Sequence, residues 1–250
     1  QMANFSYQLY SSRDFRPLPE TLKILGKLGY KQVEGYGALY ADLDQLDQLK
    51  ADLEANGLNM ATGHFDFDMV AGQSVRVLEI AKALDMSGVF VPAPPSPEYR
   101  EGKGDWAKFA VDLAEAGKPY LDEGLAVGYH NHHWEWDGAD GATAIDQLLS
   151  GDGVQLEFDV AWGVRAGKDP VAMIQKYAAK IYAAHVKDIA PAGECEDEDG
   201  WADVGHGTME WQGIMDALQA TNCTYFVMEH DKPNDDARFA RRSIEAAKKF

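Results

Sequence analysis

The sequence predicts an α/β fold in which eight parallel strands close into a (β/α)8 barrel, a TIM barrel. Short strand-like runs alternate with amphipathic helical segments in eight rounds along the 250 residues. Eight strand–helix units in about 250 residues is the usual size of such a barrel. No linker rich in Pro, Gly or Ser interrupts the alternation, so we expect one domain, residues 3–250. Neither a Gly-x-Gly-x-x-Gly motif after the first strand nor a P-loop is present, and we therefore expect no nucleotide cofactor.

The predicted strands are apolar runs bounded by turn residues. In chain order they are residues 5–10, 32–34, 59–64, 88–91, 125–130, 154–159, 181–185 and 224–229. Between them lie helical segments whose apolar residues recur at helical spacing, most clearly in residues 43–53, 75–84 and 106–121. Gly29 and Gly124, just upstream of predicted strands, are expected to end the preceding helices.

Composition excludes several classes of partner. The chain has 41 Asp and Glu against 23 Lys and Arg, a formal charge of −18, whereas nucleic-acid binding needs clustered basic residues. No apolar run approaches the roughly 20 residues of a membrane span. Two cysteines, Cys195 and Cys223, cannot build a disulfide framework, and the first residues lack a secretory pattern. We therefore expect a cytoplasmic protein without a nucleic-acid or membrane partner.

Candidate functional residues lie at the ends of the predicted strands, because (β/α)8 barrels place their active sites at the carboxyl ends of the strands. All seven histidines fall outside the predicted helices. Carboxylates close two apolar strands, at Asp159 and at Glu229. A carboxylate in such a position is costly unless a charge or hydrogen bonds compensate it. These strand ends therefore predict a site rather than a plain apolar core.

A divalent-metal site is the chemistry that these residues favour. Asp159, His185 and Glu229 end the sixth, seventh and eighth strands, which are neighbours in the barrel. If all three point inward, two carboxylates and one imidazole converge on one point. The fourth ligand is expected from the fifth strand or its loop, with Glu135 favoured and His130 second. Mn²⁺, Mg²⁺, Co²⁺ and Zn²⁺ all suit this donor set, and ligand type does not choose among them.

The chain resembles the xylose isomerase-like barrel superfamily, and in particular its sugar phosphate isomerase/epimerase group, which includes ketose 3-epimerases and inosose dehydratases. The resemblance covers essentially the whole chain. The motifs that carry it are Tyr129-His130-Asn131-His132 with Glu135, Glu157-Phe158-Asp159 with Trp162, His185-Val186-Lys187-Asp188, Val204-Gly205-His206-Gly207 with Trp211, and Met228-Glu229-His230-Asp231.

This resemblance implies one divalent cation held by Glu, Asp, His and Glu from strands five to eight, with two glutamates that also move protons. Asp159, His185 and Glu229 match the pattern position by position. Strand five departs from it, because the family's glutamate would fall near Gly128. Glu135 corresponds better to a second glutamate in the following loop.

The resemblance also implies a chemistry. The cation would polarise a carbonyl, Glu229 or Glu135 would take the neighbouring proton, and the other carboxylate or His64 would return one. We therefore expect a metal-dependent isomerase or epimerase of a sugar, keto-sugar or cyclitol. An inosose dehydratase-like lyase at the same site and a non-catalytic sugar-binding barrel are the alternatives. A DNA-cleaving hydrolase is disfavoured by the charge of −18.

Further residues are expected to contact the substrate. They are Glu34, His64, Phe67, His130, Trp162 and Lys187. Basic residues are scarce at the strand ends, which favours an unphosphorylated substrate. The glycines at 205 and 207 could bind a phosphate through their amides, but a tight loop is the favoured interpretation. Because related barrels often pair, a homodimer is one expectation for the assembly.

Overall fold

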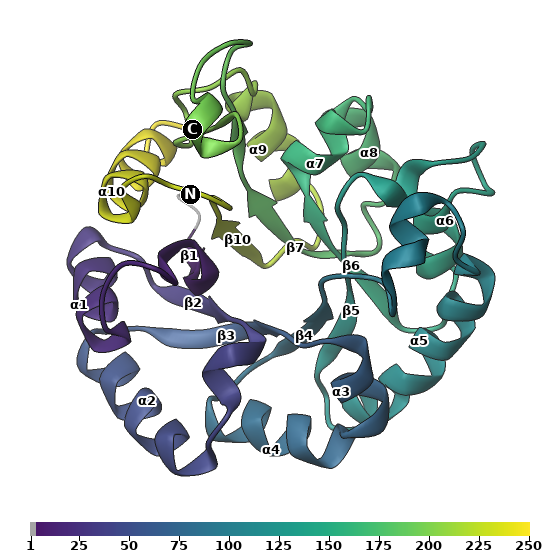
Figure 1. Ribbon diagram of the computed structural model, residues 1–250, viewed down its shortest axis with the longest axis horizontal. Coiled ribbons are helices and arrows are strands. Elements are labelled where there is room, and N and C mark those ends of the chain that lie inside the picture. The colour runs from purple at the N-terminus through teal and green to yellow at the C-terminus, as the bar shows by residue number, and fades with distance from the viewer. Residues whose placement is uncertain (1–3) are drawn as a thin grey trace.

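The computed structural model describes residues 4–250, and within that range eight parallel strands close into a barrel (Figure 1). The strands are β1 (Phe5–Gln8), β2 (Gln32–Gly35), β3 (Asn59–His64), β4 (Gly88–Val91), β5 (Ala126–His130), β6 (Val154–Asp159), β7 (Ile181–Val186) and β10 (Tyr225–Met228). Each strand pairs with the next of these eight, and β10 pairs with β1. The predicted (β/α)8 barrel is confirmed. Residue 3, the expected first residue of the domain, lies outside the described residues.

Helices surround the barrel on the outside (Figure 1). They are α1 (Leu18–Leu28), α2 (Leu43–Ala55), α3 (Phe67–Gly72), α4 (Ser74–Ala83), α5 (Trp106–Asp122), α6 (Ala144–Leu149), α7 (Val160–Arg165), α8 (Pro170–Lys176), α9 (Trp211–Gln219) and α10 (Asp236–Ala247). After β7, the short strands β8 (Asp188–Ile189) and β9 (Trp201–Ala202) form an antiparallel pair. None of the helices in residues 4–250 has both the length and the apolar character needed to cross a membrane.

Predicted and observed boundaries agree closely, with one difference at the first strand. We expected it to reach residue 10, but the chain leaves β1 after Gln8 and turns through the 3-10 helix η1 (Leu9–Ser12). The side-chain oxygen of Gln8 accepts a hydrogen bond from the Tyr10 amide at 3.0 Å, which starts this turn. Gly29 and Gly124 have φ values of +99° and +80°, as expected of glycines that end helices.

Side-chain alternation divides the strands between two environments. Tyr7 faces the helices, where its ring meets those of Tyr30 and Phe239 with centroids 5.4 and 5.9 Å away. The next residue, Gln8, faces the barrel interior and donates from Nε2 to Glu34 Oε1 at 2.8 Å. The apolar core therefore lies between strands and helices. Polar side chains of the strands, such as Gln8, lie in the barrel interior.

Candidate functional site

Donor side chains from β5, β6, β7 and the end of β10 meet inside the barrel. His130, Asp159, His185 and Glu229 each offer one atom, and these four atoms all lie within 4.8 Å of one another. We call this set the outer group. Asp159 and His185 are direct partners in the β6–β7 register, which explains their closeness. All four side chains are buried.

Lys187 provides a positive charge beside the outer group. Its Nζ lies 2.8 Å from Asp159 Oδ2 and 2.9 Å from Glu229 Oε1. Burial raises the pKa of the Asp159 carboxyl, but Lys187 and His130 outweigh that effect and hold its pKa well below the usual range. The pKa of Glu229 is likewise lowered, because Lys187 and His185 outweigh burial. Both acids are therefore carboxylates, the form that binds a cation.

A second set of donors lies on the opposite side of the His185 ring. We call it the inner group: Glu34 from β2, His64 from β3, Glu157 from β6, and Nε2 of His185. His185 Nε2 lies 2.7 Å from Glu34 Oε1 and 3.0 Å from Glu157 Oε1. His64 Nε2 contacts the same two oxygens. His185 thus connects the two groups, since its Nδ1 lies 2.9 Å from Glu229 Oε1.

The histidines of the site differ in their electrostatics. Burial lowers the pKa of His64, but the carboxylates of Glu34 and Glu157 outweigh it and raise the pKa to about 10. His130 has the opposite balance: burial and the neighbouring His185 lower its pKa to about 4. His130 is therefore a neutral imidazole. Burial lowers the pKa of His185, but Glu157, Glu229 and Glu34 outweigh it and raise that pKa, so a cation bound to His185 would displace a proton.

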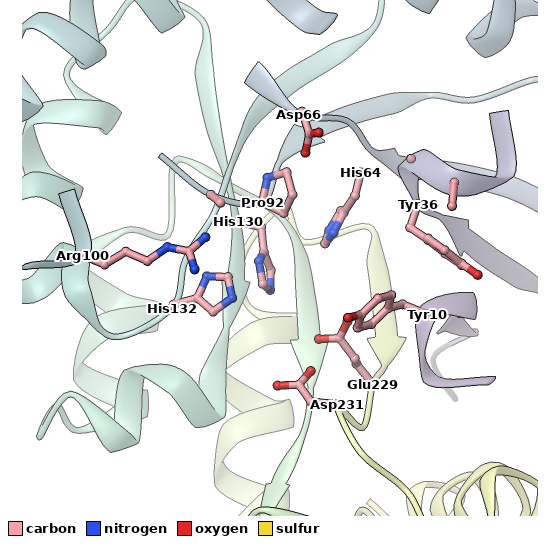
Figure 2. Close-up of a pocket in the computed structure, with 13 residues that line it drawn as sticks. Tyr10, Tyr36, His64, Asp66, Pro92, Arg100, His130, His132, Glu229 and Asp231 are labelled. Carbon is pink, nitrogen blue, oxygen red and sulfur yellow. The ribbon is translucent and has the colours of Figure 1, made fainter. Parts of the chain in front are cut away.

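A cavity of about 550 Å³ opens above these groups (Figure 2). Its lining residues are Tyr10, Tyr36, Gly37, Ala38, His64, Asp66, Pro92, Ala93, Arg100, His130, His132, Glu229 and Asp231. Tyr10 and Tyr36 lie on one side of the pocket, and Arg100 lies on the other (Figure 2). The outer group reaches the pocket through His130 and Glu229, so a bound molecule could contact it.

Glu135, the favoured fourth ligand, belongs to neither group. Its Oε2 accepts a hydrogen bond from the Tyr129 hydroxyl at 2.7 Å, and its Oε1 accepts one from the His132 amide at 3.0 Å. Burial raises its pKa to about 7. Glu135 is not among the residues that line the pocket. The fifth strand instead supplies His130, the second candidate, to the outer group.

Two of the six expected substrate contacts, His64 and His130, line the pocket. Glu34 does not, because it is fully buried and also accepts a hydrogen bond from Thr62 Oγ1 at 2.7 Å. Lys187 is only 1% exposed and is held by the carboxylates around it. Both residues are part of the interior networks rather than of the pocket wall.

The two expected aromatic walls also lie elsewhere. Phe67 begins α3 and packs its ring edge-on against Phe109, with centroids 5.0 Å apart. Trp162 packs against Trp201 at 5.0 Å and stacks on His133 at 5.2 Å. Neither is among the residues that line the pocket. The aromatic rings on the pocket come instead from Tyr10 and Tyr36.

The glycine loop that suggested a phosphate site has a partner within the chain. The amides of Gly205 and Gly207 donate to Asp188 Oδ2 at 2.9 and 3.2 Å. The Trp211 indole donates to the same oxygen at 2.9 Å. The loop amides therefore bind the Asp188 carboxylate of the protein itself. This agrees with the favoured interpretation of a tight loop rather than a phosphate site.

Sequence reasoning missed several pocket residues. Tyr10, Tyr36 and Arg100 lie in the segments that follow β1, β2 and β4, which carry no histidine or strand-closing acid. Arg100 stacks over Trp134, with its guanidinium carbon 4.6 Å from the ring centroid. Only their position in the sequence could have identified these three residues as pocket residues. They follow strand ends, on the face where (β/α)8 barrels bind ligands.

The family model described as xylose isomerase-like TIM barrel matches residues 22–250. An inosose dehydratase of Clostridium botulinum is 32% identical over 97 residues, which are 38% of this chain and 32% of that protein. An inosose dehydratase of Lacticaseibacillus casei is 26% identical over 130 residues, 46% of this chain and 43% of that protein. These matches thus span less than half of either curated relative.

Solved structures share the fold at low sequence identity. A sugar phosphate isomerase/epimerase from Parabacteroides distasonis has a TM-score of 0.79 and 19% identity, covering 98% of this chain and 93% of that one. The probable 3-DHS dehydratase AsbF from Bacillus anthracis has a TM-score of 0.75 and 12% identity, with 97% of each chain covered. The IolI protein, described with a binding zinc atom, has a TM-score of 0.68 and 17% identity, covering 98% and 95%.

Proposed function

The chain belongs to the xylose isomerase-like TIM barrel family, and from this premise we propose that it is a divalent-metal-dependent isomerase or epimerase of a sugar, keto-sugar or cyclitol. One observation carries the proposal. The outer group of two imidazoles and two carboxylates lies at the strand ends of the barrel and reaches a pocket of about 550 Å³. That combination suits a metal site that acts on a small bound molecule.

The donors fit a divalent cation. Imidazole and carboxylate ligands together suit Mn²⁺, Co²⁺ and Zn²⁺, and the two carboxylates supply the charge that a divalent cation neutralises. In this proposal His130, Asp159, His185 and Glu229 hold the cation. A cation held there supplies a Lewis acid that polarises a carbonyl oxygen and acidifies the neighbouring C–H. Lys187, beside the same carboxylates, adds a fixed positive charge.

The chain's own residues move the proton in this scheme. Glu229 lines the pocket as a carboxylate and accepts the proton from the substrate carbon. His64 also lines the pocket, and in this scheme its ring N–H returns a proton. Return to the same carbon gives epimerisation, and return to the neighbouring carbon gives isomerisation. Glu135, which we expected to share this work, is not among the residues that line the pocket.

Tyr10 and Tyr36 support a polyhydroxylated substrate. Their rings, with centroids 5.4 Å apart, form one side of the pocket, where they can pack against the apolar face of a sugar or cyclitol ring. Asp66, Asp231 and His132 line other parts of the same pocket and offer polar atoms for hydroxyl groups.

Dehydration at the same site is the second candidate. The matching curated relatives are named inosose dehydratases, although the match covers only about a third of this chain. Loss of a hydroxyl from the carbon next to the deprotonated one needs the same first step. A sugar-binding barrel without turnover is the non-enzymatic alternative.

Deuterium exchange tests the shared first step. The metal-loaded protein is incubated in D₂O with a panel of keto-sugars and inososes, and each compound is followed by NMR and mass spectrometry. We expect deuterium at the carbon next to the carbonyl of at least one compound. A change of configuration identifies an epimerase, a moved carbonyl an isomerase, and loss of water a dehydratase.

Three variants make the result specific. Glu229→Gln should abolish exchange, whereas Glu115→Gln, a change on the surface of α5, should leave it at the wild-type rate. Asp159→Asn should lower the metal content of the purified protein. Binding of a compound without any exchange would favour the sugar-binding barrel, and exchange at the wild-type rate in Glu229→Gln would contradict the assigned base.

A further inference from the structure

We propose that the inner group of Glu34, His64, Glu157 and Nε2 of His185 is a second divalent-cation site. It shares His185 with the outer group. The inference rests on the proposed function in one respect, because His185 is assigned there to the outer cation. With both sites filled, His185 would bridge the cations as an imidazolate, with Nδ1 toward the outer cation, Nε2 toward the inner one, and its ring protons released to solvent. The inner site adds a cation that does not touch the substrate.

The donor atoms of the inner group form a closed ring of four. The order is His185 Nε2, Glu34 Oε1, His64 Nε2 and Glu157 Oε1, with neighbouring atoms no more than 3.1 Å apart. Ligand atoms bound at about 2 Å to one Zn²⁺ lie roughly 3 Å from one another, which is close to the spacing of neighbouring atoms in this ring. The ring therefore has the size of a coordination sphere.

Without a cation, two of the four contacts in the ring are hydrogen bonds, from His64 Nε2 to Glu157 Oε1 and from His185 Nε2 to Glu34 Oε1. Each of the two Nε2 atoms faces two carboxylate oxygens, yet an imidazole nitrogen carries at most one hydrogen. Two of the four contacts therefore lack a proton on the line between their atoms. A cation at the centre of the ring would use one lone pair from each of the four atoms.

A second observation at Glu157 points to a ligand independently of the ring. Its other oxygen, Oε2, is buried and finds no hydrogen-bond partner among residues 4–250. The Glu157 side chain is 0% exposed, so bulk water does not solvate that oxygen either. A buried carboxylate oxygen without a partner is costly, and a cation bound by both oxygens of Glu157 would remove that cost.

The surroundings hold the ring in place. Gln8 Nε2 and Thr62 Oγ1 donate to the two oxygens of Glu34 at 2.8 and 2.7 Å, which fixes the orientation of that carboxylate. Glu34 and Glu157 are two fully buried carboxylates, and protonated His64 offsets part of their charge when no cation is bound. One divalent cation would displace that proton and balance both carboxylates. Two imidazoles among the donors favour Zn²⁺ or Co²⁺ over Mg²⁺ or Ca²⁺.

The bound stoichiometry of the whole protein tests the proposal. Protein stripped with a chelator is dialysed against Zn²⁺ or Co²⁺, and the metal per chain is measured by elemental analysis. We expect two cations per chain in the wild type and one in Glu34→Gln, in Glu157→Gln and in Asp159→Asn. Glu135→Gln is the matched control, since it alters a fully buried glutamate outside both groups, and it should retain two.

Wild-type crystals soaked in Zn²⁺ provide a readout that needs no variant. Two anomalous peaks, one on each side of the His185 ring, are the expected result. Circular dichroism and thermal unfolding show which variants have folded. In the Co²⁺-loaded protein, a magnetic coupling between the two ions should be present in the wild type and absent in Glu157→Gln.

The two proposals can fail separately. One cation per chain that is lost in Asp159→Asn but kept in Glu157→Gln would overturn the inner site and leave the proposed function standing. One cation that is lost in Glu157→Gln but kept in Asp159→Asn would support the inner site and remove the metal on which the proposed function depends. Two cations in Glu157→Gln as well as in the wild type would also overturn the inner site.

Discussion

Lys187 and Asp159 form a buried ion pair inside the barrel, with Nζ 2.8 Å from Oδ2. Glu229 and Asp231 face the same ammonium, with oxygens 2.9 and 3.3 Å away. Burial lowers the pKa of Lys187, but the three carboxylates outweigh it and raise the pKa above its usual value. The chain thus carries a permanent positive charge beside the oxygens assigned to the outer cation.

Replacement of Lys187 by methionine should make stability depend on metal. It leaves buried carboxylates without a counter-charge, so we expect the free energy of unfolding of metal-free protein to fall by about 3–5 kcal/mol. Zn²⁺ or Mn²⁺ should restore more stability to the variant than to the wild type. Urea unfolding with and without chelator measures both effects. Lys108→Met, at a 70% exposed side chain, is the control, and equal stability of the two variants would contradict the argument.

Glu135 should give the protein a pH dependence that Glu135→Gln lacks. Its pKa is raised by burial from 4.5 to about 7, so the unfolded chain loses this proton before the folded protein does. Stability contributed by the protonated form is therefore present below pH 4.5 and is lost as the pH rises to about 7. We compare the free energy of unfolding of Glu135→Gln with that of the wild type. The difference, variant minus wild type, should increase by about 3 kcal/mol between pH 4 and pH 8.

Chemical denaturation across that pH range checks this prediction. Other titrating groups are common to both proteins and cancel in the difference. A difference that stays constant with pH, or that changes in favour of the wild type, would show that Glu135 ionises normally in the folded protein.

Asp188 should be essential for the loop that precedes α9. Besides Gly205, Gly207 and Trp211, it accepts hydrogen bonds from the amides of Ile189 and Met209 at 2.8 and 3.1 Å. Asn at this position would turn an amide NH₂ toward some of these donors, so we expect Asp188→Asn to cost at least about 3 kcal/mol.

Hydrogen exchange should show the local effect of that change as faster exchange of the Gly205 and Gly207 amides. Asp216→Asn on the surface of α9 is the matched control and should change stability by less than about 0.5 kcal/mol. Unchanged protection of the loop amides in Asp188→Asn would refute the assigned role.

Gly128 should tolerate no side chain. It pairs with Gln155 between β5 and β6, and a Cβ at this position would lie 1.8 Å from the Gln155 carbonyl oxygen. We expect Gly128→Ala to lose at least about 4 kcal/mol or to fail to fold. Gly213→Ala is the opposite case. Apart from its chain neighbours and the backbone of its own helix, no heavy atom of the described residues would lie within 4 Å of the added Cβ, so the change should stabilise α9 by about 0.5–1 kcal/mol.

Thermal unfolding of the two alanine variants separates these outcomes, and a stable Gly128→Ala would require the β5–β6 pairing to differ from the one described. The close approach of Gln155 to Gly128 also affects the candidate site. The family resemblance puts a glutamate near this position, and in this chain the close approach of β6 leaves no room for a side chain at Gly128.

Local pattern was enough to predict the barrel and part of the site. The period of two in the strands and of 3.6 in the helices can be read along the chain, and both periods persist in the folded protein. Asp159 and His185 could be predicted as neighbours because each ends a strand, and adjacent parallel strands end at the same face. The loop after β5 was less predictable, because hydrogen bonds from Tyr129 and His132 decide where Glu135 points.

The sequence by itself determined the alternation of strands and helices, the end of the barrel at which polar residues gather, and the side chains that close β6, β7 and β10. Only the tertiary structure decided the partners of those side chains. Glu34 and His64 come from β2 and β3, more than 90 residues before Glu157, and they meet it across the interior of the barrel. The physical reason is closure: when β10 pairs with β1, strands that are distant in sequence face each other across a narrow interior.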